Sequence, residues 1–267
     1  MSLPVFYSAE ISNLACEDIC TIRGSEAHHA VAVRRIRPGE KIAVVDGKGR
    51  RGILLVQSTE KATLTGQIQA ITDYSPTMPQ ITLVQALAKG GRAEQAVETA
   101  TEFGVDSIIP WAAERSVVRW ESAQKSAKGR SRWEATAYEA AKQARRAYFP
   151  QVDELVDSGA LAEKISDFVA TGAWVLVCHE EAVHSLAQVL TNLFNSALAQ
   201  NSSQPNFPSR LVYIVGPEGG ITFAELAAFQ AAGAQAVLLG EHILRSSSAG
   251  PWAIAVTRAF LDKSRVK

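Results

Sequence analysis

The chain has 267 residues, of which 47% are hydrophobic and 20% are charged, with 27 basic and 27 acidic side chains. This composition is typical of one large globular domain or two smaller ones, and it excludes a disordered or fibrous chain. No apolar segment approaches bilayer length and no signal-peptide pattern opens the chain, so we expect a cytoplasmic protein.

The three cysteines (Cys16, Cys20 and Cys178) are too few and too scattered for a disulfide framework. Cys16 and Cys20 lack the spacing and the companion ligands of a metal site. We therefore interpret them as packing residues and expect no bound metal.

The charges balance overall but are unevenly distributed along the chain. Residues 23–51 hold eight Lys or Arg against three Asp or Glu, and residues 114–146 hold nine against four. Because salt screens charges beyond roughly 8–10 Å, a phosphate backbone responds to local basic surfaces more than to total charge. The two segments are compatible with RNA binding, although an ordinary solvated face gives the same pattern.

Residues 1–75 predict a small β-rich domain. Two strands flank a glycine-rich turn within 41–56, and 63–71 alternates between apolar and polar residues like a half-buried strand. A short helical segment is expected over 25–35. Short strands with few helices indicate a small barrel.

Pro76 and Pro79 mark a linker, because proline stops both the preceding and the following pattern. Beyond it we predict an α/β domain over 76–267. Its expected elements are, in order, strand 81–87, a helix over 93–103 ending at Gly104, strand 106–110, helix 131–146, strand 173–180 and helix 182–198. Residues 200–208 form a polar, flexible insertion.

Two glycine-containing turns follow, each after a short apolar run that indicates a buried strand. After the first, at 216–220, Thr222 and Glu225 have the spacing of a capping box and predict a helix. After the second, the hydroxyls of Ser246 to Ser248 are expected to cap a helix over 249–260. Repeated strand, turn and helix indicate a parallel sheet, whose ligands bind at the carboxyl ends of the strands. Each turn alone could equally be an ordinary connection.

Together, GPEGGIT at 216–222 and LGEHILRSSSA at 239–249 are similar to the paired motifs of the SPOUT methyltransferases. They resemble in particular the RsmE-type enzymes, which methylate N3 of a uridine in 16S ribosomal RNA. HHAVAVRRIRPGE, KGGRAEQAVETATEFGVDSIIPWAAERSVV and EAAKQARRAYFP also resemble the corresponding family segments.

The resemblance implies a SPOUT-type, trefoil-knotted parallel-sheet domain over 76–267, preceded by a PUA-like RNA-binding β-barrel over 1–75. It implies S-adenosyl-L-methionine as cofactor and a homodimer. The substrate would be 16S rRNA or the assembled small ribosomal subunit.

The resemblance also implies candidate site residues. Cofactor contacts, mostly through the backbone, are expected near Leu176, His179, Gly216, Gly219, Gly240, Leu244 and Ala249. RNA contacts are expected at Arg23, His28, His29, Arg34, Arg35, Arg37, Arg115, Arg145 and Arg146. The histidine pair could instead serve packing or capping, and Arg145 with Arg146 could complement a helix dipole.

Arg245 and Glu218 are the catalytic candidates. Arg245 is a permanent cation that could stabilise charge on the uracil oxygens, or hold a phosphate of the target nucleotide. Glu218 could shape the loop, meet the cofactor amine or act as a base.

Ser247 stands where the family commonly has glutamate, so a role that needs a carboxylate there is lost. One alternative is therefore an RNA-binding ribosome-assembly factor with weak or lost activity. Another is an RNA methyltransferase acting on a different atom, such as the ribose 2′-oxygen. A dinucleotide-dependent enzyme is disfavoured, because neither G-x-G-x-x-G nor G-x-x-x-x-G-K-[ST] follows a strand.

Overall fold

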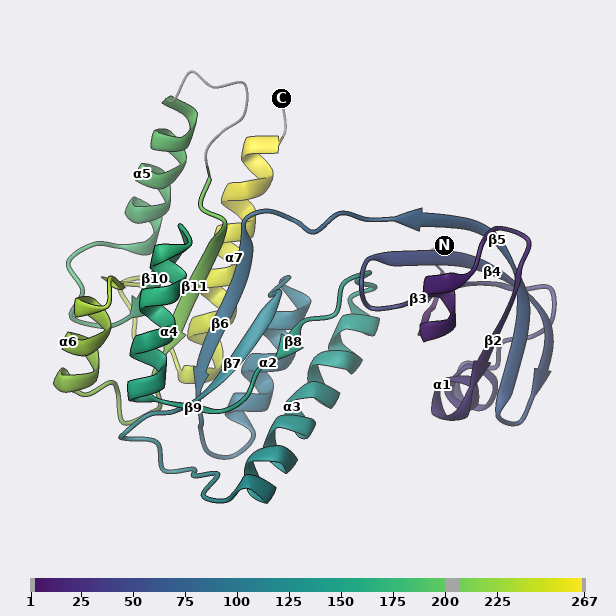
Figure 1. The fold of residues 1–267 in the computed structure, drawn as a ribbon, viewed down its shortest axis with the longest axis horizontal. Helices are drawn as coiled ribbons and strands as arrows, with labels where there is room; N and C mark the ends of the chain where they lie inside the picture. The colour runs from purple at the N-terminus through teal and green to yellow at the C-terminus, as the bar shows by residue number, and fades with distance from the viewer. Residues whose placement is uncertain (1–2, 200–206, 266–267) are drawn as a thin grey trace. The chain divides into compact units, whose positions relative to one another are not determined.

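The computed structural model describes residues 3–199 and 207–265, and Figure 1 shows their fold. The chain divides into two compact units. The first runs to Pro76 and also includes Ala141–Phe149, while the second comprises Thr77–Ala140 and the chain from Pro150 onward. The predicted domain boundary at residue 75 therefore leaves out Ala141–Phe149, where the chain returns to the first unit.

The first unit is built on a five-stranded sheet. In hydrogen-bonded order its strands are β1 (Val5–Tyr7), β3 (Lys41–Val45), β4 (Arg50–Glu60), β5 (Thr63–Asp73) and β2 (Ile19–Arg23). β1 runs parallel to β3 and the other pairs are antiparallel. A short 3-10 helix, η1 (Ala9–Asn13), follows β1, and the predicted helical segment is α1 (Gly24–His28) continuing into η2 (His29–Val33). Alternate strand residues such as Ile22, Leu54 and Ile68 fill the core.

The returning segment Ala141–Phe149 is held by a buried ion pair. Lys142 Nζ donates to Glu26 Oε1 at 2.6 Å, and only 4% of the lysine side chain and 13% of the glutamate side chain are exposed. Glu26 also accepts from the backbone N–H of Tyr7. Removal of either charged partner would leave a buried charge without compensation, so this pair ties the segment firmly to the first unit.

The second unit is built on a seven-stranded parallel sheet. Its strands in order are β12 (Gln235–Val237), β10 (Trp174–Cys178), β11 (Arg210–Val215), β6 (Gln80–Ala86), β7 (Ser107–Ala112) and β8 (Gln151–Val152), with β9 (Val156–Asp157) also pairing with β7. Because all pairs are parallel, the carboxyl ends of these strands meet at one edge, which we call the carboxyl edge.

Helices cover both faces of this sheet (Figure 1). One face packs against α2 (Arg92–Glu102), α3 (Ala123–Gln143), α5 (Leu186–Ala199) and α7 (Ser246–Arg265). The other face packs against α4 (Ser158–Ala170) and α6 (Phe223–Ala231). The strands are buried on both faces, as expected for a parallel sheet.

Helix α7 runs from the carboxyl edge toward the opposite edge. It follows β12, and further along it Arg258 donates to Gly104 O and pairs with Asp106 at 2.9 Å, just before β7 begins. The N-terminus of α7 therefore lies beside the loops that leave the carboxyl edge.

Several predicted elements differ from the structure at their boundaries. Helix α3 begins at Ala123 rather than residue 131, and α5 begins at Leu186 rather than residue 182. Helix α7 begins at Ser246, so its serines form the first turn and do not precede it. Helix α4 was not expected at all, and residues 200–206 of the predicted insertion lie outside the described residues. The described helices include none long and apolar enough to cross a membrane.

Candidate functional site

The first glycine turn is held between two arginines. Arg92 Nη1 donates to Glu218 Oε1 at 2.9 Å, and Arg115 Nη1 donates to the carbonyl of Gly219 at 3.1 Å. A Cβ added at Gly219 would lie 3.0 Å from Arg115 Cβ, so this glycine permits the close packing. Arg115 was predicted to contact RNA, and in the structure it supports the turn. Arg92 was not predicted, although it opens the helix after β6 at the same edge.

The pKa of the Glu218 carboxyl is lowered. Burial favours its neutral form, but hydrogen bonds from the backbone N–H groups of Glu218 itself and Lys89, and from the Arg92 guanidinium, outweigh that effect. Glu218 therefore stays ionised at neutral pH. This arrangement favours the loop-shaping interpretation of the residue over a role as base.

Glu225 joins three separate segments beneath the same turn. Its buried carboxylate accepts from the backbone N–H of Glu114 at 2.8 Å, from Ser158 Oγ at 2.7 Å and from the Thr222 N–H at 2.9 Å. Ser158 in turn accepts from Trp111 Nε1. The predicted capping box is confirmed, and its glutamate also positions the loop after β7 and the start of α4.

Burial alone would raise the pKa of the Glu225 carboxyl. The donors from Glu114, Ser158 and Thr222 reverse that effect and hold the pKa below its ordinary value. The charged form of this side chain therefore stabilises the loops.

The loop after β10 is tied to the end of β12. The His179 N–H donates to Val237 O at 3.0 Å, and Leu238 N–H donates to His184 O at 2.9 Å. His179 Nδ1 also accepts from the Glu181 N–H. Leu176 lies inside β10, where it is paired with Tyr213 of β11 and Gln235 of β12, and it is 1% exposed.

The loop after β12 is more open. A Cβ added at Gly240 would meet no heavy atom within 4 Å, and Ile243 is 81% exposed. The side chain of Arg245 is exposed and makes no hydrogen bond or ion pair with the described residues, while its carbonyl accepts from the N–H groups of Ser248 and Ala249. Leu244 is half-buried and Ala249 is buried where α7 begins. Six of the seven predicted cofactor positions thus lie in, or next to, loops at the carboxyl edge, and Leu176 lies in the middle of β10.

The other RNA-binding candidates lie in the first unit. Arg23, His28, Arg34, Arg35 and Arg37 are exposed there. His29 is half-buried and packs edge-to-face on Phe6, with 6.0 Å between ring centroids, which favours its packing role.

Arg145 and Arg146 lie just beyond the end of α3, in the segment that returns to the first unit. Arg145 has a left-handed backbone with φ 56°. The chain has therefore left the helix at these residues, and they do not lie within its last turn.

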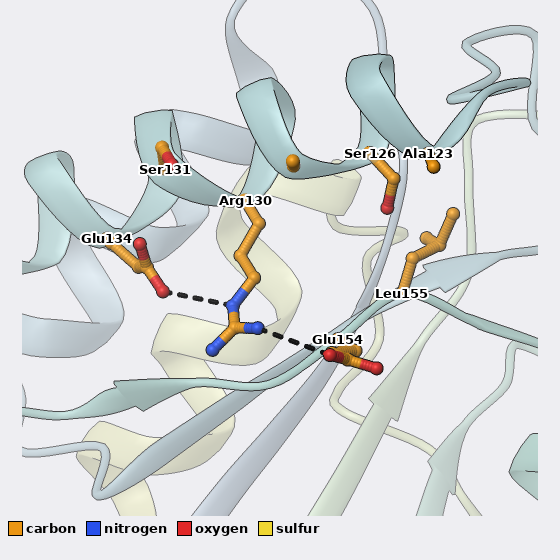
Figure 2. Close-up of a pocket in the computed structure, with 8 residues that line it drawn as sticks. Ala123, Ser126, Arg130, Ser131, Glu134, Glu154 and Leu155 are labelled. Carbon is orange, nitrogen blue, oxygen red and sulfur yellow. Dashed lines mark ion pairs between the residues drawn. The ribbon is translucent and has the colours of Figure 1, made fainter.

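Figure 2 shows a pocket of about 430 Å³ elsewhere in the second unit, between α3 and residues 154–155. Arg130 lies in it and pairs with Glu134 at 3.0 Å and with Glu154 at 3.7 Å. None of the sequence-predicted site residues lines it. The described residues also include no cluster of three or more His, Cys, Asp or Glu able to hold a metal ion.

Comparison with known proteins identifies both parts of the chain. Residues 75–258 match the family model described as an RNA methyltransferase domain, and residues 22–69 match an RNA methyltransferase PUA domain. These matches, with the parallel sheet, confirm the predicted fold class of a PUA-like domain followed by an α/β methyltransferase domain. The trefoil knot stays a prediction.

Relatives of known name align over nearly the whole chain. The chain is 40% identical over 245 residues to "Ribosomal RNA small subunit methyltransferase E" of Mycobacterium bovis, covering 92% of this chain and 88% of the relative. It is 30% identical over 252 residues to the Bacillus subtilis protein of the same name, covering 93% and 94%.

A solved structure agrees with this relationship. "Ribosomal RNA small subunit methyltransferase E" from Neisseria gonorrhoeae, bound to S-adenosyl methionine, has a TM-score of 0.79 to this chain at 27% identity. The match covers 97% of this chain and 98% of that one.

We expect Glu225→Gln to lower the free energy of unfolding at pH 7 by about 2 kcal/mol, because the hydrogen bonds that Glu225 accepts are made to a charged group and the substitution removes that charge. Folding lowers this pKa below its ordinary 4.5, so the stabilisation is complete above that value and is lost as pH falls through the folded-state pKa. Urea denaturation should therefore show the difference between variant and wild type shrinking below pH 4.5. Glu121→Gln, at a side chain that is 69% exposed, is the control. An equal effect of the two substitutions would contradict the proposed role of Glu225.

Proposed function

The chain belongs to the RNA methyltransferase family, and we propose that it transfers the methyl group of S-adenosyl-L-methionine to N3 of one uridine in 16S ribosomal RNA. The observation that carries this proposal is the 40% identity, over 92% of the chain, to a protein named for methylation of small-subunit ribosomal RNA. A protein with this substrate would act in the cytoplasm, on free rRNA or on the small subunit.

The loops at the carboxyl edge fit such a cofactor. Gly240 leaves open space where a side chain would stand, so a ligand can approach its main chain. The turn at Gly216 and Gly219 is already packed against Ile221 and Arg115, which presents its backbone in one conformation. We assign cofactor binding to the main chain near these glycines, near Leu176 and His179, and at Leu244 and Ala249.

The reaction requires that N3 of uridine lose its proton before or during attack on the methyl group, which the bound sulfonium supplies. Negative charge then spreads onto the ring oxygens, and a fixed cation stabilises it. We assign this role to Arg245, which is exposed in the second loop and carries a permanent charge. Correct positioning of the two reactants can supply up to ~7–11 kcal/mol of the remaining barrier.

Glu218 is assigned to the loop and not to proton transfer. Its carboxylate pairs with Arg92, and its lowered pKa makes it a weak base at neutral pH. The exposed arginines at 34, 35 and 37 in the first unit are assigned to RNA phosphates.

Nucleoside mass spectrometry of 16S rRNA from a strain lacking the gene tests the function directly. We expect loss of N3-methyluridine and its return when the wild-type gene is restored. If the deletion strain lacks no methylated nucleoside that the wild type has, an assembly factor is favoured. Loss of a 2′-O-methylated nucleoside would instead favour the ribose oxygen as acceptor.

Complementation of the same strain with Arg245→Ala tests the catalytic cation. We expect methylation to fall at least about 100-fold, as for loss of one transition-state donor, with cofactor affinity nearly unchanged. Equal losses of methylation and of cofactor affinity would count against a catalytic role. A loss of RNA affinity as large as the loss of methylation would indicate that Arg245 holds a phosphate.

Gly240→Val and Gly219→Val separate contact with the cofactor from support of the fold. A Cβ at Gly240 meets no atom of the protein within 4 Å, so we expect an unchanged melting temperature and at least about tenfold weaker binding of S-adenosylhomocysteine. Gly219→Val should lower both stability and affinity, because its side chain meets Arg115. Calorimetry and thermal melting measure the two quantities. Undiminished affinity in Gly240→Val would remove that loop from the site.

We also propose a homodimer. Large apolar side chains are exposed in loops at the carboxyl edge and on α7, including Val183 at 89%, Ile243 at 81% and Trp252 at 37%. A second copy of the chain would cover them. Light scattering should give twice the chain mass of 28.7 kDa, and a single-chain mass at micromolar concentration would refute the dimer.

A further inference from the structure

Three buried polar atoms lack a hydrogen-bond partner near the carboxyl edge. They are Gln85 Oε1, Ser116 Oγ and Ser246 Oγ, among five such side-chain atoms in the described residues. Folded proteins pair most of their buried polar atoms, because an unpaired one lowers stability. Several unpaired atoms at the ligand-binding edge of a sheet indicate groups whose partner arrives with the ligand.

Gln85 lies one residue before the end of β6 and is 0% exposed. It is paired in the sheet with Val215, the residue before Gly216. Its amide nitrogen donates to the carbonyl of Ala86 at 3.3 Å. Because a carbonyl only accepts, the NH₂ must face Ala86 and the oxygen must point away from it. The missing partner of Gln85 is therefore a hydrogen-bond donor.

Ser246 lies over the same part of the sheet. A Cβ added at Gly250 would lie 2.6 Å from Leu83 Cδ1, so α7 crosses β6 there. One helical turn back to Ser246 moves about 6 Å toward the carboxyl edge. Two residues along β6, from Leu83 to Gln85, move about 6.6 Å the same way on the same face. Ser246 is 8% exposed and shares a helix face with Gly250 and Ala253, which pack on the sheet, so this spacing places both side chains between α7 and the sheet.

The surrounding charge restricts what can bind there. The N-terminus of α7 carries a partial positive charge, and Arg245 adjoins it. An ammonium group would be repelled, whereas a hydroxyl can donate to Gln85 and also accept from Ser246, and the amino group of a base can donate to Gln85.

We propose that Gln85 and Ser246 form a subsite for the nucleoside part of S-adenosylmethionine, with Gln85 Oε1 accepting a hydrogen bond from one of its hydroxyl or amino groups. This inference rests on the proposed function and extends it to side chains outside the two glycine turns. It also explains why two buried polar atoms are left unpaired in the protein by itself.

Gln85→Met tests the subsite, because it should raise the stability of the free protein and weaken cofactor binding. Without ligand, the variant should melt about 2–4 °C higher, because an unpaired buried amide is replaced by an apolar side chain of similar length. Its dissociation constant for S-adenosylhomocysteine, measured by calorimetry, should rise about tenfold. Ser246→Ala should weaken binding in the same direction, and it serves as the test if Gln85→Met does not fold.

Thr82→Val is the matched control on the same strand. Thr82 is buried but already paired with Ser107 Oγ at 2.8 Å and Arg210 Nη1 at 3.1 Å. We expect this variant to melt lower than wild type and to bind S-adenosylhomocysteine with unchanged affinity.

Three results would overturn the inference. The first is an unchanged affinity for S-adenosylhomocysteine in both Gln85→Met and Ser246→Ala. The second is a melting temperature of Gln85→Met below that of wild type, because this result would mean that the Gln85 amide already has a hydrogen-bond partner. The third concerns 5′-methylthioadenosine, which lacks the amino-acid tail. Gln85→Met should weaken the binding of this compound by the same factor as that of S-adenosylhomocysteine. A loss confined to S-adenosylhomocysteine would place the contact on the tail. If the wild type binds neither compound, the proposed function itself fails.

Discussion

The buried carboxylate of Glu225 is the interaction on which the candidate site depends. Its partners come from chain segments as distant as 111 and 67 residues, the loop after β7 and the start of α4. Burial of a charge is costly unless donors surround it, and here backbone and hydroxyl donors satisfy both carboxylate oxygens. Because one side chain holds these segments together, Arg115 is placed where it can reach the carbonyl of Gly219.

The glycines of the two loops serve different physical purposes. Gly219 is required by the protein's own packing, since any side chain there meets Arg115, whereas Gly240 faces open space. A packed turn beside an open one gives a site that is rigid on one side and accessible on the other. In our proposal, Gln85 and Ser246 also serve binding at the expense of stability, because their unpaired polar atoms lower stability until a ligand pairs with them.

The first unit supplies a basic surface on a separately packed core. The end of α3 and the residues after it belong to the same unit, where Lys142 and Glu26 form a pair that is nearly inaccessible to water. A fragment of the first 75 residues would lack this segment and leave Glu26 without its partner. Among the described residues, no hydrogen bond or ion pair occupies the side chains of the exposed arginines near η2, so these side chains are available to phosphate groups.

Local patterns in the sequence were sufficient for the strand–turn–helix units, the capping box at Thr222 and the family resemblance of the two glycine turns, because each depends on residues near one another in the chain. The start of α7 at Ser246, the helix α4 and the pairing of Arg92 with Glu218 were not predicted. The last of these joins residues 126 positions apart. Such contacts depend on the strand order β12-β10-β11-β6-β7, which periodicity does not encode. The sequence therefore determined which segments form the candidate site, and only the tertiary structure decided which side chains support them, since long-range hydrogen bonds exist only once the sheet has brought its carboxyl ends together.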